Sequence, residues 1–183
     1  MELTSGQRIT IRGGHLKYRN FRGLSNDYNK EGDRNTRIVI DEKLAQDLIA
    51  AGVDGVKINP PREEGDAPEC LLRLLVRYYY EEDGTPSSSN PNVWLVTKNG
   101  RKRLLEKQVG NVDTADIDHV DAVFRIASWK YGQKRGLHCK LVSLFCTLIE
   151  DPLEEEYKDV PEINSSDAGE RYEEDVPPFE EED

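Results

Sequence analysis

Four segments of the chain carry basic and aromatic side chains at positions separated by multiples of two residues. Because side chains alternate between the two faces of a β-strand, this spacing places both kinds of group on one face. Arginine and lysine neutralise phosphates, and flat aromatic rings stack on unpaired bases for about 1–3 kcal/mol each. The pattern comprises Lys17, Arg19 and Phe21; Arg73, Arg77 and Tyr79; Trp94 and Lys98; and Arg125, Trp129 and Tyr131. Such faces suit single-stranded nucleic acid.

The same spacing also occurs on ordinary solvated strand faces, and either tryptophan alone fits a core position equally well. Recurrence on four segments favours binding over these explanations. We therefore predict that the aromatic side chains stack on bases and that the basic ones contact phosphates. The stacking set is Phe21, Tyr79, Trp94, Trp129 and Tyr131, and the phosphate set is Arg19, Arg73, Arg77, Lys98 and Arg125.

Further cations gather in predicted loops and at a predicted hairpin tip. They are Lys30, Arg34, Arg37, Arg101–Arg103, Lys134 and Arg135. Cations at loop tips either follow a phosphate backbone or only increase solubility, and the second explanation fits any one of them. We include Arg34 in the predicted nucleic-acid site because it belongs to a long polar loop, residues 23–35.

Signals for catalysis are weak. The three histidines, His15, His119 and His138, are scattered, and no phosphate-binding or dinucleotide-binding glycine motif occurs. Residues 116–121 place aspartates around His119, but a solvated acidic turn explains them better than a metal site does. We expect no enzymatic activity, no metal and no cofactor.

The cysteines and the apolar segments constrain the cellular setting. Cys70, Cys139 and Cys146 are odd in number and lack metal-ligand spacing, so we expect buried free thiols in a reducing compartment. No apolar run reaches the roughly 20 residues that a membrane helix needs, and the first residues lack a signal-peptide pattern. We expect a protein of the cytoplasm, the host-cell cytoplasm if the protein is viral, that contacts no membrane.

Charge is distributed very unevenly along the 183 residues. The net charge is −11, but residues 150–183 alone hold 16 acidic and two basic residues, or −14. Residues 1–149 consequently carry 20 acidic and 23 basic residues, or +3. A mildly basic body with a strongly acidic arm indicates a polyanion partner or an interaction tail.

Periodicity predicts mostly strands. The expected strands are residues 8–12, 16–22, 37–40, 56–58, 71–80 and 93–97, with a long hairpin from 120–131 and 137–149 around 132–136. One helix is expected over 42–51, with Asp41 as its N-cap and Gly52 at its end. The stretches 59–68 and 83–91 are predicted as loops, and 101–119 as a short strand and a loop.

These elements predict a mainly β fold. An OB-like five-stranded barrel with extra strands and one inserted helix is the first choice, with an SH3-like barrel or a plain sandwich as alternatives. Residues 1–149 would form the nucleic-acid-binding domain. Residues 150–183 would form a disordered acidic tail, because the charged stretch lacks enough apolar residues to bury a core.

The end of the chain supplies a family resemblance. Asp175-Val176-Pro177-Pro178-Phe179, within an acidic stretch, resembles the acidic tip of bacterial and phage single-stranded-DNA-binding proteins. The segment Tyr28-Asn29 with Gly32–Asn35, before a short strand and a helix, resembles phage-encoded proteins of the same role. The resemblance implies that Asp175, Pro177, Pro178 and Phe179 bind replication and recombination proteins.

The leading hypothesis is a phage-type single-stranded-DNA-binding protein that protects strands during replication or recombination, with a homo-oligomer as one open assembly state. One alternative is an acidic inhibitor module whose tail mimics nucleic acid and occupies a basic site on another protein. The other is a structural virion protein. At low salt the tail would compete with DNA for the basic body.

Overall fold

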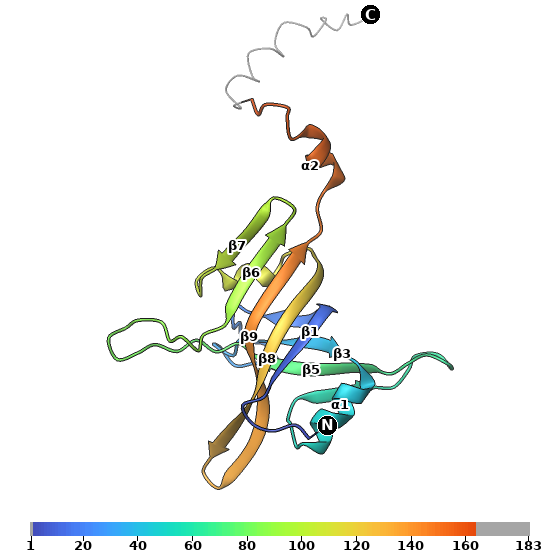
Figure 1. Ribbon diagram of the computed structural model, residues 1–183, viewed down its shortest axis with the longest axis vertical. Coiled ribbons are helices and arrows are strands. Elements are labelled where there is room, and N and C mark those ends of the chain that lie inside the picture. Colours follow the sequence, from blue (N-terminus) through green and yellow to red (C-terminus); the bar gives the residue numbers. More distant parts are fainter. Residues whose placement is uncertain (1, 164–183) are drawn as a thin grey trace, which may run out of the picture. The chain divides into compact units, whose positions relative to one another are not determined.

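Residues 2–163 are described by a computed structural model, shown in Figure 1. The chain divides into residues 1–149 and residues 150–183. Among the described residues of the first part, nine strands form one sheet. They are β1 (Arg8–Gly14), β2 (Leu16–Asn20), β3 (Asn35–Ile40), β4 (Val56–Asn59), β5 (Glu69–Leu75), β6 (Asn92–Thr97), β7 (Gly100–Leu104), β8 (Ile117–Tyr131) and β9 (Lys134–Leu148).

Five strand positions close into a barrel. β1 pairs with β8, and β2, separated from β1 by only His15, pairs with β3, so the two form one bent strand. β3 pairs antiparallel with β5, β5 runs parallel to β9, and β9 pairs antiparallel with β8, which returns to β1. This closed order confirms the prediction of a mainly β, OB-like barrel with extra strands.

The bend in the first strand depends on two glycines. Gly13 has a backbone φ of +59°, a conformation that residues with a side chain rarely adopt. A Cβ on Gly14 would lie 3.0 Å from Ile11 Cγ2, and the register with β8 shifts between these two residues. The glycines thus allow one strand to pair with two different neighbours.

The barrel interior is apolar and alternates with an outer face. On β8, the period of two predicts a core face of Val120, Ala122, Phe124, Ile126 and Ser128; the first four are buried, but Ser128, close to the hairpin tip, is exposed. The described part of the chain has three free cysteines, and all are buried, as predicted. Burial raises the pKa of the Cys139 and Cys146 thiols to about 12, so neither is a reactive thiolate at neutral pH.

Helix α1 (Glu42–Ala50) follows β3 directly. The Asp41 carboxylate accepts a hydrogen bond from the Leu44 amide at 2.7 Å, which confirms Asp41 as the N-cap. Ala45 and Leu48 are fully buried on the face turned to the barrel. Among residues 2–163, no helix is long and apolar enough to cross a membrane.

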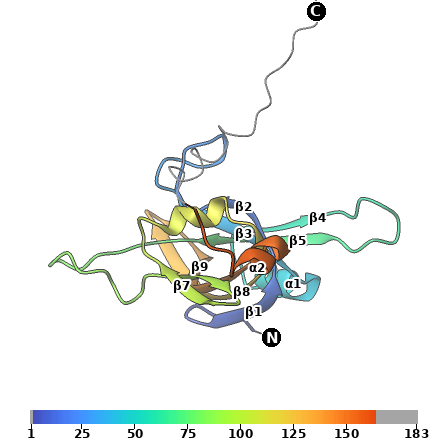
Figure 2. The same ribbon diagram turned by 90° about the horizontal axis from the view of Figure 1, so that it is seen from above.

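Two further elements lie between β5 and β8. β6 runs parallel to the second half of β9, and β7 pairs only with β6, so this hairpin extends the sheet beyond the barrel. The 3-10 helix η1 (Val109–Asp113) buries Val109 and Val112 in the core. Figure 2 shows the β4–β5 loop and the β5–β6 connection extending from opposite sides of the barrel.

Three predicted boundaries need correction. β5 ends at Leu75 instead of Tyr80: the Val76 amide still donates to the Arg34 carbonyl in register with β3, but the Tyr79 backbone bonds the side chain of Asn90 instead of a strand. The β8–β9 turn has two residues instead of five, so the hairpin is longer than predicted. The acidic segment contains a short helix, α2 (Pro152–Tyr157), that the sequence did not predict.

Candidate nucleic-acid interface

Strand register aligns six basic residues across the outer face of the barrel. Directly opposite residues on paired strands share a face, so each pairing extends the row. The only interruption lies between β9 and β5, where Lys140 faces Leu75, two residues from Arg73. We call this set the cation row: Arg8, Arg125, Lys140, Arg73, Arg37 and Lys17, from β1, β8, β9, β5, β3 and β2 respectively.

A groove of about 360 Å³ opens beside the middle of the cation row. Its lining includes three predicted site residues, Trp129, Arg73 and Arg77. The sequence pattern selected Arg77 as part of a strand face, but Arg77 lies beyond the end of β5 and reaches the groove from the following segment. His138, Asp33 and Asp54 also line the groove. We call this site the Trp129 groove.

Trp129 lies flat on the sheet. Its cross-strand partner is Gly136, and a Cβ on that glycine would come 2.8 Å from the indole atoms Nε1, Cε2 and Cζ2. Equal distances to three ring atoms show that the indole face covers the glycine. The indole Nε1–H donates to Asp54 Oδ2 at 2.8 Å, which fixes the ring in its plane. Trp129 is therefore a held platform with one face covered by Gly136.

His138 contributes an unsatisfied polar atom to the same groove. Its Nε2 is buried and has no hydrogen-bond partner among the described residues. Burial lowers the pKa of the imidazole, and the nearby charges of Lys140 and Arg77 lower it further. The ring is consequently neutral at neutral pH.

Two loops adjacent to the groove each present a tyrosine. Tyr131 stands at the β8–β9 tip with 83% of its surface exposed, and Tyr28, in residues 21–34, is 93% exposed. The second loop reaches the groove through Asp33, whose Oδ1 lies 3.9 Å from Arg77 Nη1. OB folds commonly bind oligonucleotides between these two loops.

The second predicted tryptophan is already covered. Trp94 packs parallel to Phe145, its partner on β9, with ring centroids 6.0 Å apart and an interplanar angle of 6°. The Arg101 guanidinium lies 4.4 Å from the centroid of the indole ring. Lys98 is exposed at the turn that follows β6. We call Trp94, Phe145 and Arg101 the Trp94 patch.

Burial corrects the prediction for Phe21, and hydrogen bonding changes the interpretation of Arg19. Phe21 is completely buried in the core, so its ring is unavailable for stacking on a base. The Arg19 guanidinium donates to the carbonyls of Val112 and Ala115, both at 2.8 Å, and thereby joins β2 to the η1 region. The geometry supports a structural role for Arg19 instead of a phosphate contact.

Other predicted residues have partners within the chain. The Arg34 guanidinium pairs with Glu106 at 2.6 Å and lies 5.3 Å from the Tyr78 ring centroid, so its charge is partly compensated. Tyr79 is 45% exposed, and Lys140 Nζ lies 5.2 Å from the Tyr79 ring centroid and donates to its hydroxyl at 3.0 Å. Arg125, in the cation row, keeps a buried Nε without a partner among the described residues.

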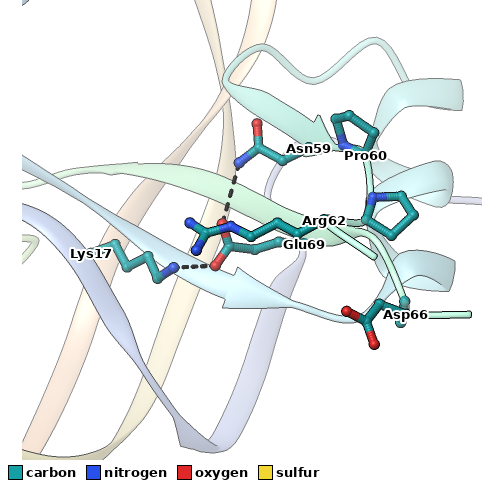
Figure 3. A pocket seen from close by; sticks show the side chains of 8 residues that line it. Lys17, Asn59, Pro60, Arg62, Asp66 and Glu69 are labelled. Carbon is teal, nitrogen blue, oxygen red and sulfur yellow. Dashed lines mark hydrogen bonds and ion pairs between the residues drawn. The ribbon is translucent and has the colours of Figure 1, made fainter. Parts of the chain in front are cut away.

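A larger pocket, of about 580 Å³, begins where the cation row ends at Lys17. Figure 3 shows Lys17 and Asn59 both bonded to the carboxylate of Glu69, with Arg62 alongside. These hydrogen bonds, that from Lys17 first, lower the pKa of Glu69. Because this carboxylate opposes Lys17, the pocket has mixed charge and a weaker attraction for phosphate.

The aspartates near His119 do not form a metal site. Asp121 accepts a hydrogen bond from the Gly13 amide at 2.9 Å, and Asp118 pairs with His119 at 2.7 Å. Across residues 2–163, no group of three His, Cys, Asp or Glu side chains is arranged to hold an ion.

Sequence reasoning missed several residues that line or adjoin the Trp129 groove. Gly136, His138 and Lys140 lie on β9, whose outer face the sequence pattern did not mark. Asp54 lies in the turn after α1, where its amide donates to the Leu137 carbonyl at 2.8 Å. A glycine within a strand often marks a close approach, but the predicted hairpin placed Gly136 in its turn, so the signal was hidden until the true register was known.

Residues 4–182 match the model of a family described as "Putative phage ssDNA-binding domain". The chain belongs to this family. The match spans the barrel and nearly all of the acidic segment, and it confirms the resemblance to phage single-stranded-DNA-binding proteins. Asp175, Pro177, Pro178 and Phe179 lie outside the described residues.

Solved structures similar to this family member include proteins from two phages. The single-stranded DNA-binding protein from bacteriophage Enc34, in complex with ssDNA, shares 11% identity with a TM-score of 0.45, covering 79% of this chain and 88% of that one. The C-terminal truncation of that protein shares 11% identity with a TM-score of 0.46, and the match covers 79% of this chain and 87% of that one. The single-stranded DNA binding protein gp2.5 of bacteriophage T7 shares 10% identity with a TM-score of 0.40, and the match covers 86% of this chain and 98% of that one. No curated protein matches.

Proposed function

We propose that the protein binds single-stranded DNA without catalysis, by stacking bases on Trp129 and holding phosphates with the cation row. The observation that carries this proposal is the indole lying flat over Gly136 inside a groove that Arg73 and Arg77 also line. An aromatic platform among cations suits unpaired bases, since duplex DNA hides its base faces. Membership of the phage family supports the same ligand.

The path of the strand follows from the two loops and the row. DNA would cross the outer face near the middle of the cation row, with Tyr131 and Tyr28 on adjacent loops available for further stacking. Arg125 and Lys140 are cross-strand partners on β8 and β9, so they would contact consecutive or neighbouring phosphates. Binding would tolerate most sequences because phosphate contacts carry no base information.

Lys98, Trp94 and Arg34 have a smaller role in this proposal. Trp94 already contacts Phe145 and Arg101, and Arg34 is paired with Glu106. Lys98 and Arg34 would add at most some positive charge at the edge of the DNA path, and Trp94 would not stack on a base. Tyr79 would stack only after Lys140 moves to a phosphate.

In the cell, the protein would protect single strands during phage replication or recombination in the host cytoplasm. The acidic segment 150–183 would recruit replication or recombination proteins through Asp175, Pro177, Pro178 and Phe179. The charge of −14 on this segment and its resemblance to acidic tips support this assignment. Homo-oligomer formation belongs to the same proposal.

Fluorescence titration tests DNA binding directly. Poly-dT should quench tryptophan emission, and affinity should fall as salt rises because counterions are released from the DNA. Duplex DNA of equal length should bind much more weakly. Equal affinity for the duplex would refute base stacking, and no quenching together with no binding would favour the acidic-inhibitor alternative.

Deletion of residues 150–183 tests the tail. Removing 14 net negative charges should tighten DNA binding at low salt and have little effect at high salt, because screening weakens competition between exposed charges. A truncated chain with the same affinity and the same salt slope as the full chain would contradict competition by the tail.

A further inference from the structure

The Trp129 groove contains acceptors as well as cations. Asp54 and Asp33 line it together with Arg73 and Arg77, whereas a surface that only attracts phosphate would gain nothing from carboxylates. Asp33 lies beside Arg77, and Asp54 holds the Trp129 indole through Oδ2, but phosphate binding gives no role to the second oxygen of Asp54. The position of this oxygen beside an aromatic platform suggests contact with a base edge.

Asp54 is held in a fixed position. Its amide donates to the Leu137 carbonyl at 2.8 Å, and the preceding residue, Val53, forms a bridge with Leu137. Gly55 follows with φ of +88°, and a Cβ there would come 2.9 Å from Arg73 Cβ. The turn is thus packed tightly onto β5 and β9, and the Asp54 carboxylate cannot drift far from Trp129.

The two oxygens of Asp54 differ in occupancy. Oδ2 accepts the hydrogen bond from the Trp129 indole at 2.8 Å, while Oδ1 accepts none from the described residues. An oxygen beside the ring edge lies within reach of the edge of a base stacked on that ring. His138 also lines the groove, and its Nε2 is buried without a hydrogen-bond partner among the described residues.

We propose that the Trp129 groove is a base-selective subsite that prefers a base with an exocyclic amino group, such as cytosine, over thymine. The inference rests on the proposed binding of single-stranded DNA and deepens it. An amino group donates to the Asp54 carboxylate, as carboxylates accept from cytosine N4 in known complexes. Thymine offers one ring N–H between two carbonyl oxygens, and those oxygens repel the carboxylate.

The test compares bases that match in shape. An oligothymidylate of about twelve nucleotides, within the range that one OB fold covers, carries one central substitution. 5-Methylcytosine keeps the methyl group and outline of thymine but replaces the O4 acceptor by an amine. 2-Pyrimidinone, used as its 5-methyl derivative, keeps the methyl group and lacks only that amine. The 5-methylcytosine oligonucleotide should bind about fivefold more tightly than the thymine oligonucleotide. The 2-pyrimidinone oligonucleotide should bind no more tightly than the thymine oligonucleotide.

The variant Asp54→Asn tests the assigned residue. Asparagine can keep its oxygen on the Trp129 indole and present an NH2 donor in place of Oδ1, so the preference should vanish or reverse toward thymine. The control variant Glu82→Gln removes one exposed negative charge outside the groove lining. It should tighten binding of all three oligonucleotides alike and retain the preference.

The outcomes separate this inference from the proposed function. Equal, salt-sensitive affinity of the unaltered protein for all three oligonucleotides would overturn base selection and leave DNA binding intact. Tight binding of the 2-pyrimidinone oligonucleotide, or an unchanged preference in Asp54→Asn, would also overturn it. Absence of binding to every oligonucleotide would refute the proposed function itself.

Discussion

The two tryptophans lie in similar positions but in opposite circumstances. Trp129 and Trp94 both lie on the outer face of the sheet, and both are paired across to β9. Opposite Trp129 stands Gly136, which lets the ring lie flat on the strand. Opposite Trp94 stands Phe145, and Arg101 lies over the indole ring. The identity of the partner residue therefore decides whether an outward tryptophan is a platform or part of a packed cluster.

The comparison also concerns charge. In the Trp129 groove, Arg73 lines the cavity as part of a row that continues across neighbouring strands. In the Trp94 patch, Arg101 is held against a ring and Arg103 donates to Asn92 at 2.6 Å. A cation already engaged within the chain must break that contact before it binds phosphate, so it contributes less.

Removing each tryptophan is the most direct way to break the comparison. Trp129→Ala should weaken binding of oligo-dT about 10- to 100-fold, since base–aromatic stacking contributes about 1–3 kcal/mol per base. Trp94→Ala should change affinity by less than about threefold, because its ring has no bound base to lose. Fluorescence anisotropy with a labelled oligonucleotide measures both, and equal losses would show that the two sites are equivalent.

Filling the space beneath Trp129 is the next test. Gly136→Val would place a Cβ 2.8 Å from the indole atoms, so the ring must tilt away from the strand. Affinity should fall about tenfold, a large part of a stacking interaction, although the net charge is unchanged. Ser128→Ala, on an exposed residue beside Trp129, is the control. Thermal melting checks that both variants remain folded, and wild-type affinity in folded Gly136→Val would contradict a flat platform.

Charge removal sharpens the second part of the comparison. The double variant Arg73→Gln/Arg77→Gln should reduce the steepness of log K against log salt by about 1.4, since each phosphate contact to a single strand contributes about 0.7. The matched pair Arg101→Gln/Arg103→Gln should reduce it much less. Titrations at four salt concentrations give both slopes. If the second pair lowers the slope as much as the first, the DNA path includes the Trp94 patch.

The smallest expected effect concerns uncovering Trp94. Arg101→Ala removes the guanidinium from the ring face, and the exposed indole should then gain some DNA contact. In a Trp129→Phe background, Trp94 is the chain's remaining tryptophan, so oligo-dT should quench emission more strongly after Arg101→Ala than before. Overall affinity should shift by less than about twofold, because a lost cation offsets a gained ring. Unchanged quenching would show that DNA does not reach this region.

Local sequence signals were sufficient for much of the fold. The period of two in 120–126 defined the buried face of β8, and Asp41 before an apolar helical pattern defined the start of α1. These features depend on neighbours in the chain, so composition and spacing reveal them. Alternation failed beyond Leu75, where the chain leaves the sheet and the Tyr79 backbone bonds the side chain of Asn90, a contact that the spacing of residues along the strand does not reveal.

The candidate site was predictable only in part. Basic and aromatic spacing identified Trp129, Arg73 and Arg125, which lie on the outer face. The same spacing selected Phe21, although its ring is in the core. Phe21 lies one residue beyond the end of β2, and the irregular register between Lys17 and Asn20, where Tyr18 has φ of +50°, breaks the alternation that the prediction assumed.

The sequence by itself determined the mainly β composition, the N-cap of α1, the basic body with its acidic segment, and the kinds of side chain available for binding nucleic acid. Tertiary structure decided which of those side chains meet. Register across six strands aligned the cation row, and the pairing of Gly136 with Trp129 made the platform. The physical reason is that register and barrel closure depend on contacts between distant segments, which local spacing does not encode.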